Sequence, residues 1–218
     1  MMIPSVVSVI SAYLIGSIPF PYIFGKVFGG VDIREVGSKN MGAMNVYRIC
    51  GAIPGALCMI LEFGKGAGAF FVARAFGVPI WVYLFSGIFC VLGHDFPLFL
   101  KFRGGKGAGC AIGYLLSLMP FPTLSSLGVI SIPFFITRNA SFSSAIGFLL
   151  LPLFSWVFLG GDPDFIFYLV SSIAIPIVVG LKQLPTVIQT WSKAPDRREA
   201  IRRLVFERRS FDDRQSFS

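Results

Sequence analysis

The sequence is poor in charged residues and has no long polar segment before its C-terminal end. Only 14% of the 218 residues are charged, against about 25% in soluble domains, and 55% are hydrophobic. Residues 182–218 form the one long polar segment. This composition excludes a soluble monomer and leaves no room for a separate soluble module.

Paired cysteines and N-terminal targeting signals are also missing. The four cysteines, Cys50, Cys58, Cys90 and Cys110, have no CxxC spacing, so we expect neither a disulfide nor a metal site. The N-terminus has no charged segment ahead of its first apolar run and no cleavage signal. We therefore expect residues 2–28 to be retained as a first membrane span.

Apolar runs of helical length are abundant. A helix needs about 20 residues to cross a hydrocarbon core of about 30 Å, and candidate runs lie at 3–25, 53–76, 79–100, 107–119, 121–136, 143–160 and 165–181. The pattern predicts an all-α polytopic membrane bundle of about seven segments, with a membrane domain at 1–181 and a basic tail at 182–218. The fourth and fifth runs are short, so a re-entrant hairpin with five full crossings is the alternative.

Positive charges fall on alternate connections between these runs. Seventeen of the 19 lysines and arginines lie in the first, third and fifth connections or in the tail. The positive-inside rule then predicts an outside N-terminus and a cytoplasmic C-terminus. Because this topology accounts for the net charge of +8, no nucleic acid partner is expected, and the tail suits an interfacial helix on anionic lipid.

The first basic connection contains residues suited to a phosphate group. Between Gly37 and Gly51 it holds Ser38, Asn40, Asn45 and Arg48 together with three glycines. Glycine lets a backbone approach a ligand closely, and these polar side chains donate hydrogen bonds to phosphate oxygens. The alternative is a turn-rich loop in which Asn and Ser serve as caps.

The second such connection runs from Gly93 to Gly109, where the sequence Gly104-Gly105-Lys106-Gly107 opens an apolar helix. Unpaired N–H groups at a helix N-terminus, together with a lysine, form an anion site, and we expect phosphate there. The segment is not a Walker-type loop, because Leu100 replaces its first glycine and Gly107 replaces its Ser/Thr. The alternative for Lys106 is a lysine that snorkels to the membrane surface.

Some ionisable residues within the apolar runs have a possible function. His94, the only histidine, lies near the cytoplasmic end of the third run and is either a general base or a hydrogen-bonding residue at a helix end. Glu62 and Lys65 are three residues apart in the second run. Because a charge inside a bilayer is costly, we expect these two to pair and to support the neighbouring loops.

With these motifs, the sequence resembles the bacterial acyl-phosphate:glycerol-3-phosphate acyltransferases, small polytopic enzymes that begin phospholipid synthesis. The family's first pattern, Ser-x-Asn-x-Gly-Ala-Thr-Asn-x-x-Arg, extends here from Ser38 to Arg48, with Met44 in place of Thr. The second, Gly-His-x-Phe-Pro-x-Phe-Leu-x-Phe-x-Gly-Gly-Lys-Gly, is complete from Gly93 to Gly107. The resemblance extends from about residue 10 to residue 160.

Two shorter matches and one departure complete the resemblance. LEFGKG at 61–66 is similar to the family's Asp-x-x-Lys-Gly, and Ser141 belongs to a serine pair that follows a basic residue. The family's third pattern comes directly after the last span. Here its nearest match lies further on, at 197–204, and Glu207 and Arg209 replace its closing Gly and Glu.

The resemblance implies transfer of an acyl group from acyl phosphate to the 1-hydroxyl of glycerol-3-phosphate in the bacterial inner membrane. It implies no cofactor, no metal and no obligate protein partner, and membrane lipids around the acyl chain. The residues that it marks as catalytic candidates are Ser38, His94 and Lys106. Those that it marks for substrate binding are Asn40, Asn45, Arg48, Gly104, Gly105, Gly107 and Ser141.

Two other functions remain open from the sequence. A paralogue with the same fold would bind a phosphorylated lipid or glycerol phosphate without turnover, and the departure in the third pattern supports it. A transporter is the third reading, but the sequence has no inverted repeat that we can find, and its polar residues lie in loops.

Overall fold

The computed structural model describes residues 2–206, which are helical and contain no strand. The helices are α1 (Met2–Ser17), α2 (Phe20–Gly29), α3 (Ala43–Cys50), α4 (Ala52–Ala75), α5 (Ile80–Asp95), the 3-10 turn η1 (Leu98–Leu100), α6 (Ala108–Leu118), α7 (Pro120–Thr137), α8 (Ala140–Leu159), α9 (Phe165–Ser192) and α10 (Arg197–Val205). The predicted all-α class is confirmed. The end of the predicted tail, with Glu207 and Arg209, lies outside the described residues.

Six of the seven predicted segments are long and apolar enough to cross a membrane. The first combines α1 with α2, and the third combines α5 with η1. The fourth segment, α6, has only 11 residues, which rise about 16 Å, roughly half of a hydrocarbon core. The fifth, α7, has 18 residues and the length of a full crossing.

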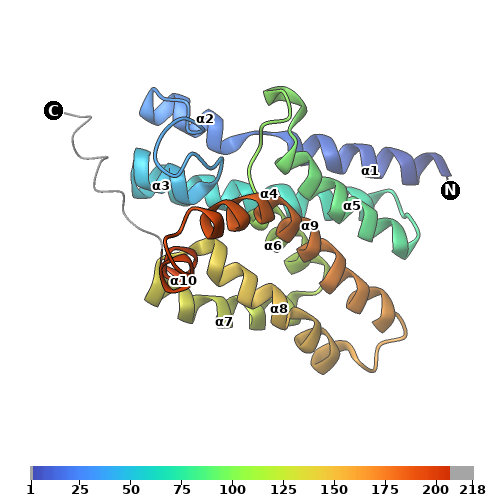
Figure 1. Ribbon diagram of the computed structural model, residues 1–218. Coiled ribbons are helices and arrows are strands. Elements are labelled where there is room, and N and C mark those ends of the chain that lie inside the picture. The colour runs from blue at the N-terminus through green and yellow to red at the C-terminus, as the bar shows by residue number, and fades with distance from the viewer. Residues whose placement is uncertain (1, 207–218) are drawn as a thin grey trace.

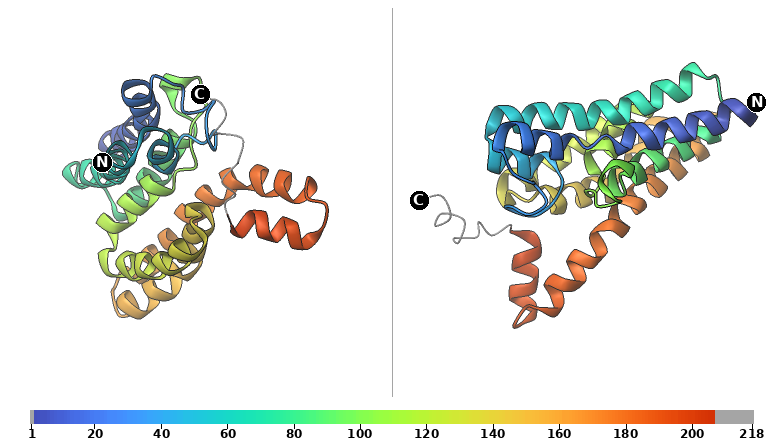
Figure 2. Two further views of the ribbon diagram at one scale, coloured as in Figure 1. Left: turned by 90° about the vertical axis from the view of Figure 1, so that its left-hand side faces the viewer. Right: turned by 90° about the horizontal axis from the view of Figure 1, so that it is seen from above.

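Most of the helices lie side by side along one axis, so most of their connections gather at two ends (Figure 1). The connection between α2 and α3, the turn between α7 and α8, and α10 lie toward one end in Figure 1 and in the right view of Figure 2. The N-terminus and the turns between α4 and α5 and between α8 and α9 lie at the other. The first and fifth connections, which are basic, therefore share an end of the bundle.

Glycines allow two helix pairs in the interior to pack with their backbones close together. A Cβ atom added at Gly113 of α6 would overlap the main chain of Phe63 in α4, and one at Gly66 of α4 would overlap Cys110. Gly93 of α5 packs in the same way on the main chain of α1. Small residues at such contacts are typical of membrane helices, and here they bring α1, α4, α5 and α6 together around one buried site.

The first span is broken between α1 and α2. Pro19 has no N–H group and ends the hydrogen-bond ladder, so α1 stops at Ser17. The carbonyl oxygens of Gly16 and Ile18 accept hydrogen bonds from Lys65 Nζ, at 3.0 and 2.9 Å. A lysine of α4 therefore satisfies backbone groups that the break leaves without helical partners.

The last long helix continues beyond the predicted end of its span. We predicted a boundary at residue 181, whereas α9 ends at Ser192, so the boundary between membrane domain and tail falls inside a helix. Leu184, Ile188 and Trp191 recur at helical spacing and are exposed, which explains why the helix continues although hydropathy falls at Lys182. The end of α9 and α10 project from the bundle (Figure 2).

Candidate functional site

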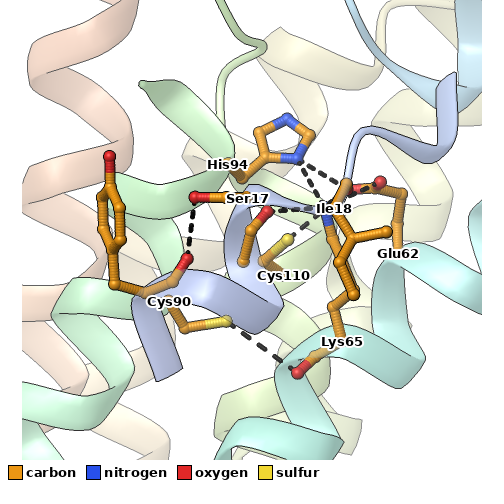
Figure 3. Close-up of polar contacts among 9 residues, drawn as sticks. Ser17, Ile18, Glu62, Lys65, Cys90, His94 and Cys110 are labelled. Carbon is orange, nitrogen blue, oxygen red and sulfur yellow. Dashed lines mark hydrogen bonds and ion pairs between the residues drawn. The ribbon is translucent and has the colours of Figure 1, made fainter. Parts of the chain in front are cut away.

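A buried cluster of charges connects α4 with the end of α5 (Figure 3). Lys65 Nζ lies 3.0 Å from Glu62 Oε1, which confirms the predicted pair. His94 Nδ1 joins both residues, at 2.8 Å from Glu62 Oε2 and 3.1 Å from Lys65 Nζ. All three side chains are at most 5% exposed, so His94 is held inside the protein by ionic partners.

The same cluster includes a cysteine and has the residue types of a metal site. Cys110 Sγ donates to Glu62 Oε2 at 3.4 Å, and possible ligand atoms of Glu62, His94 and Cys110 lie within 4.8 Å of one another. The ammonium of Lys65, however, already contacts both Glu62 and His94. A bound cation would have to displace it, so this geometry fits an internal ion pair better than a metal ion.

His94 also supports the glycine loop. Its carbonyl oxygen accepts a hydrogen bond from the Gly105 N–H at 3.2 Å. A Cβ atom at Gly104 would overlap that carbonyl, and one at Gly105 would overlap the His94 ring and the Met41 carbonyl. The second basic loop is therefore folded tightly against His94, and it meets the first loop at Met41.

Lys106 follows this tight turn and reaches another helix. It is half-buried, one residue before Gly107, which has φ +68° and precedes the first turn of α6. Lys106 Nζ donates to Ser141 Oγ in the first turn of α8 at 3.4 Å. Two residues that were predicted to bind phosphate are thus in contact, and each lies next to the N-terminus of a helix.

Asn45 has a role that differs from the prediction. Its Oδ1 accepts the N–H of Ser38 at 3.0 Å. Its Nδ2 donates to the carbonyl oxygens of Ile33, Val36 and Asn40, at 2.9, 3.0 and 3.1 Å. The amide is 2% exposed and its hydrogen-bonding groups are all engaged with the backbone. Asn45 therefore fixes the first loop, and it has no donor left for a substrate.

The other polar residues of the first loop lie on its accessible side. Ser38 is exposed, Asn40 is half-buried, and Arg48 is exposed in the last turn of α3. These three side chains retain the access to solvent that a substrate-binding role requires.

An acidic residue of this loop is neutralised by its neighbour. The Arg34 guanidinium lies 2.7 Å from Asp32 Oδ2, and its hydrogen bonds lower the pKa of Asp32 from 3.8 to about 2. Asp32 therefore stays ionised and paired at neutral pH, which limits its repulsion of an anion bound nearby.

Two contacts beside the site were not predicted. Cys110 is an apolar residue in the sequence, and nothing in its neighbours signals a hydrogen bond to Glu62. Lys182 was counted with the tail, yet it donates to the carbonyl of Asp95, directly after His94. The one sequence signal for Lys182 is its place at the end of the last predicted span.

Comparison with known proteins gives consistent matches over most of the chain. A family model described as glycerol-3-phosphate acyltransferase matches residues 6–188. Glycerol-3-phosphate acyltransferase 2 of Dehalococcoides mccartyi is 35% identical over 205 residues, which cover 93% of this chain and 96% of that protein. Glycerol-3-phosphate acyltransferase of Thermotoga petrophila is 40% identical over 159 residues, covering 70% of this chain and 78% of that protein.

Solved structures match at the level of the fold as well. The crystal structure of the integral membrane glycerol 3-phosphate acyltransferase PlsY in its glycerol 3-phosphate form is 35% identical, with a TM-score of 0.75. The match covers 86% of this chain and 92% of that chain. The lysophosphatidic acid form of PlsY is 34% identical, with a TM-score of 0.74 and the same coverage.

Proposed function

Because the chain belongs to the glycerol-3-phosphate acyltransferase family, we propose that it transfers an acyl group from acyl phosphate to the 1-hydroxyl of glycerol-3-phosphate. The products are lysophosphatidate and inorganic phosphate, and the site of action is the bacterial inner membrane. The proposal rests on the similarity to glycerol-3-phosphate acyltransferases and on the chemistry of the site.

The observation that carries the proposal is the contact between Lys106 and Ser141, at 3.4 Å, where α6 and α8 begin. An ammonium, a hydroxyl and the N–H groups at the start of α6 suit a phosphate group. Both proposed substrates carry one. Phosphate affinity alone does not identify a reaction, so the acceptor and donor follow from the family.

The chemistry needs no nucleophile from the protein. The 1-hydroxyl oxygen attacks the carbonyl carbon of acyl phosphate, and the bond between that carbon and the phosphate oxygen breaks. The hydroxyl proton passes to a phosphate oxygen, and the released phosphate takes the electron pair of the broken bond. Because acyl phosphate is already activated, positioning and charge stabilisation by Lys106 and the loop amides supply most of the rate.

The remaining residues divide between contact with substrate and support. Ser38, Asn40 and Arg48 would bind polar or phosphate groups of the substrates from the first loop. His94 would orient the glycine loop, since its buried ring is engaged with Glu62 and Lys65. Asn45 would hold the first loop in shape. The acyl chain would lie among the apolar helices next to membrane lipid.

The test is purified protein in detergent, or in vesicles, mixed with acyl phosphate and glycerol-3-phosphate. Release of phosphate that depends on glycerol-3-phosphate, with formation of lysophosphatidate, supports the proposal. A parallel reaction with acyl-coenzyme A tests the donor. Binding of glycerol-3-phosphate without phosphate release in any lipid would instead identify a non-catalytic paralogue.

A further inference from the structure

Lys182 of α9 contacts the turn that follows α5. Its ammonium donates to the main-chain oxygen of Asp95 at 3.0 Å and lies 3.8 Å from the centre of the Phe96 ring. A hydrogen bond to a carbonyl and a cation–π contact hold the same ammonium, which is half-buried. Residues that are 87 positions apart in the sequence are thereby joined.

The buried side chain of Asp95 lies next to this contact. Asp95 is 1% exposed, and within residues 2–206 neither carboxylate oxygen has a hydrogen-bond partner. Lys65 is already paired with Glu62. Lys182, held at 3.0 Å on the main-chain oxygen of Asp95, brings a second positive charge close to this buried carboxyl group.

The turn held by Lys182 also carries the glycine loop. A Cβ atom at Gly107 would lie 3.0 Å from Asp95 Oδ1, so the carboxylate packs against the start of α6. His94, the preceding residue, accepts the Gly105 N–H, and the Pro97 carbonyl accepts the Phe102 N–H at 3.0 Å. Movement of this turn would move Lys106 with it.

We propose that Lys182 is a positioning residue of this acyltransferase: it fixes the turn at Asp95 and Phe96, next to the buried Asp95 carboxyl group, and so sets the position of the glycine loop. The inference rests on the proposed function. Lys182 acts through the turn and does not contact the substrate. Its side chain reaches the site from the helix that sequence analysis assigned partly to the tail.

The experiment compares three single variants of the full chain by kcat, by KM for both substrates and by thermal unfolding in detergent. In Lys182→Met we expect kcat/KM to fall at least tenfold, because the loop loses its support. Lys182→Arg should recover most of the loss, since a guanidinium also donates to a carbonyl and stacks on Phe96. The matched control is Lys193→Met, an exposed lysine about three turns further along on the same face, which should behave as wild type.

A double variant tests the role of the carboxylate. If the Lys182 charge interacts with the Asp95 carboxyl group, Lys182→Met should lower the unfolding temperature less in an Asp95→Asn background than in wild type. Equal drops in unfolding temperature in both backgrounds would overturn the inference, and so would wild-type kcat and KM in Lys182→Met. In either case, phosphate release by the wild type would leave the proposed function intact. A wild type without phosphate release would overturn the proposed function, and with it the positioning role.

Discussion

At the scale of single residues, Lys106 bears most of the proposed chemistry. Replacing it with alanine removes the charge that we propose binds a phosphate, and a charged hydrogen bond is worth about 1.5–3 kcal/mol. We expect kcat/KM to fall by about tenfold to a hundredfold or more in Lys106→Ala, with the unfolding temperature nearly unchanged. Lys106→Arg should also fail, because a planar guanidinium does not fit the tight glycine loop.

The control for Lys106 is Arg103→Ala, which removes an exposed positive charge from the same loop. It should retain most of the activity. Near-normal turnover in Lys106→Ala would reduce this lysine to a cation of the membrane surface and remove the main support for the site.

Asn45 is a residue that we expect to stabilise the first loop without contacting the substrate. Asn45→Ala removes four hydrogen bonds within the first loop, and we expect a loss of about 1–3 kcal/mol in stability together with lower activity. Asn45→Asp should be worse, because it places carboxylate oxygens against three carbonyl oxygens. Limited proteolysis of the loop and thermal unfolding would measure both. If Asn45→Asp is as stable as wild type, the assigned contacts are wrong.

Sequence alone predicted some contacts of the candidate site, and it could not predict others. The Glu62–Lys65 pair follows from spacing and the cost of buried charge, and it is confirmed. The contact between Lys106 and Ser141 joins two segments that the resemblance had marked. The function of Asn45 depends on the path of the loop around it, which no local pattern specifies.

At the scale of helices, the contact between α4 and α6 depends on glycine. Gly113→Ala places a methyl group on the main chain of Phe63, and overpacking of this kind costs about 1–3 kcal/mol. Gly64→Ala is the matched control in α4, because a Cβ atom there meets no atom within 4 Å. We expect a lower unfolding temperature only for Gly113→Ala. Equal stability of the two variants would contradict the packing.

Truncations separate the parts of the C-terminal region. Ending the chain after Arg209 keeps every described contact and should preserve activity. Ending it after Leu181 cuts α9 and removes Lys182, so activity should be lost while the rest of the bundle still forms. Phosphate release and size-exclusion chromatography would measure the two properties. Full activity of the chain that ends at Leu181 would show that the end of α9 is dispensable.

The spans were predicted to within a few residues, and the end of α9 was not. Hydropathy identifies a segment by its mean, and this mean falls at Lys182 and Gln183 even though the helix continues as an amphipathic one. The short α6 was predicted as a segment; it begins after Gly107 of the glycine loop and ends at Leu118, just before α7 begins at Pro120.

At the scale of the whole molecule, topology is the open prediction. We expect the connection between α2 and α3 to face the cytoplasm and the turn between α8 and α9 to face outside. Glu35→Cys and Pro163→Cys, both at exposed positions, can be labelled with an impermeant thiol reagent after the native cysteines are replaced. Only Pro163→Cys should react in intact cells. Labelling of both from the same face would show that the number of crossings is wrong.

The break in the first span has a consequence for the order of assembly during synthesis. The Gly16 carbonyl lies near the end of the first helix to leave the ribosome and the Ile18 carbonyl in the break after it, whereas their partner, Lys65, follows 49 and 47 residues later. Until α4 arrives, both oxygens lack this ammonium, and lipid offers no donor in its place. We therefore expect the first span to complete its insertion together with the second, as a pair.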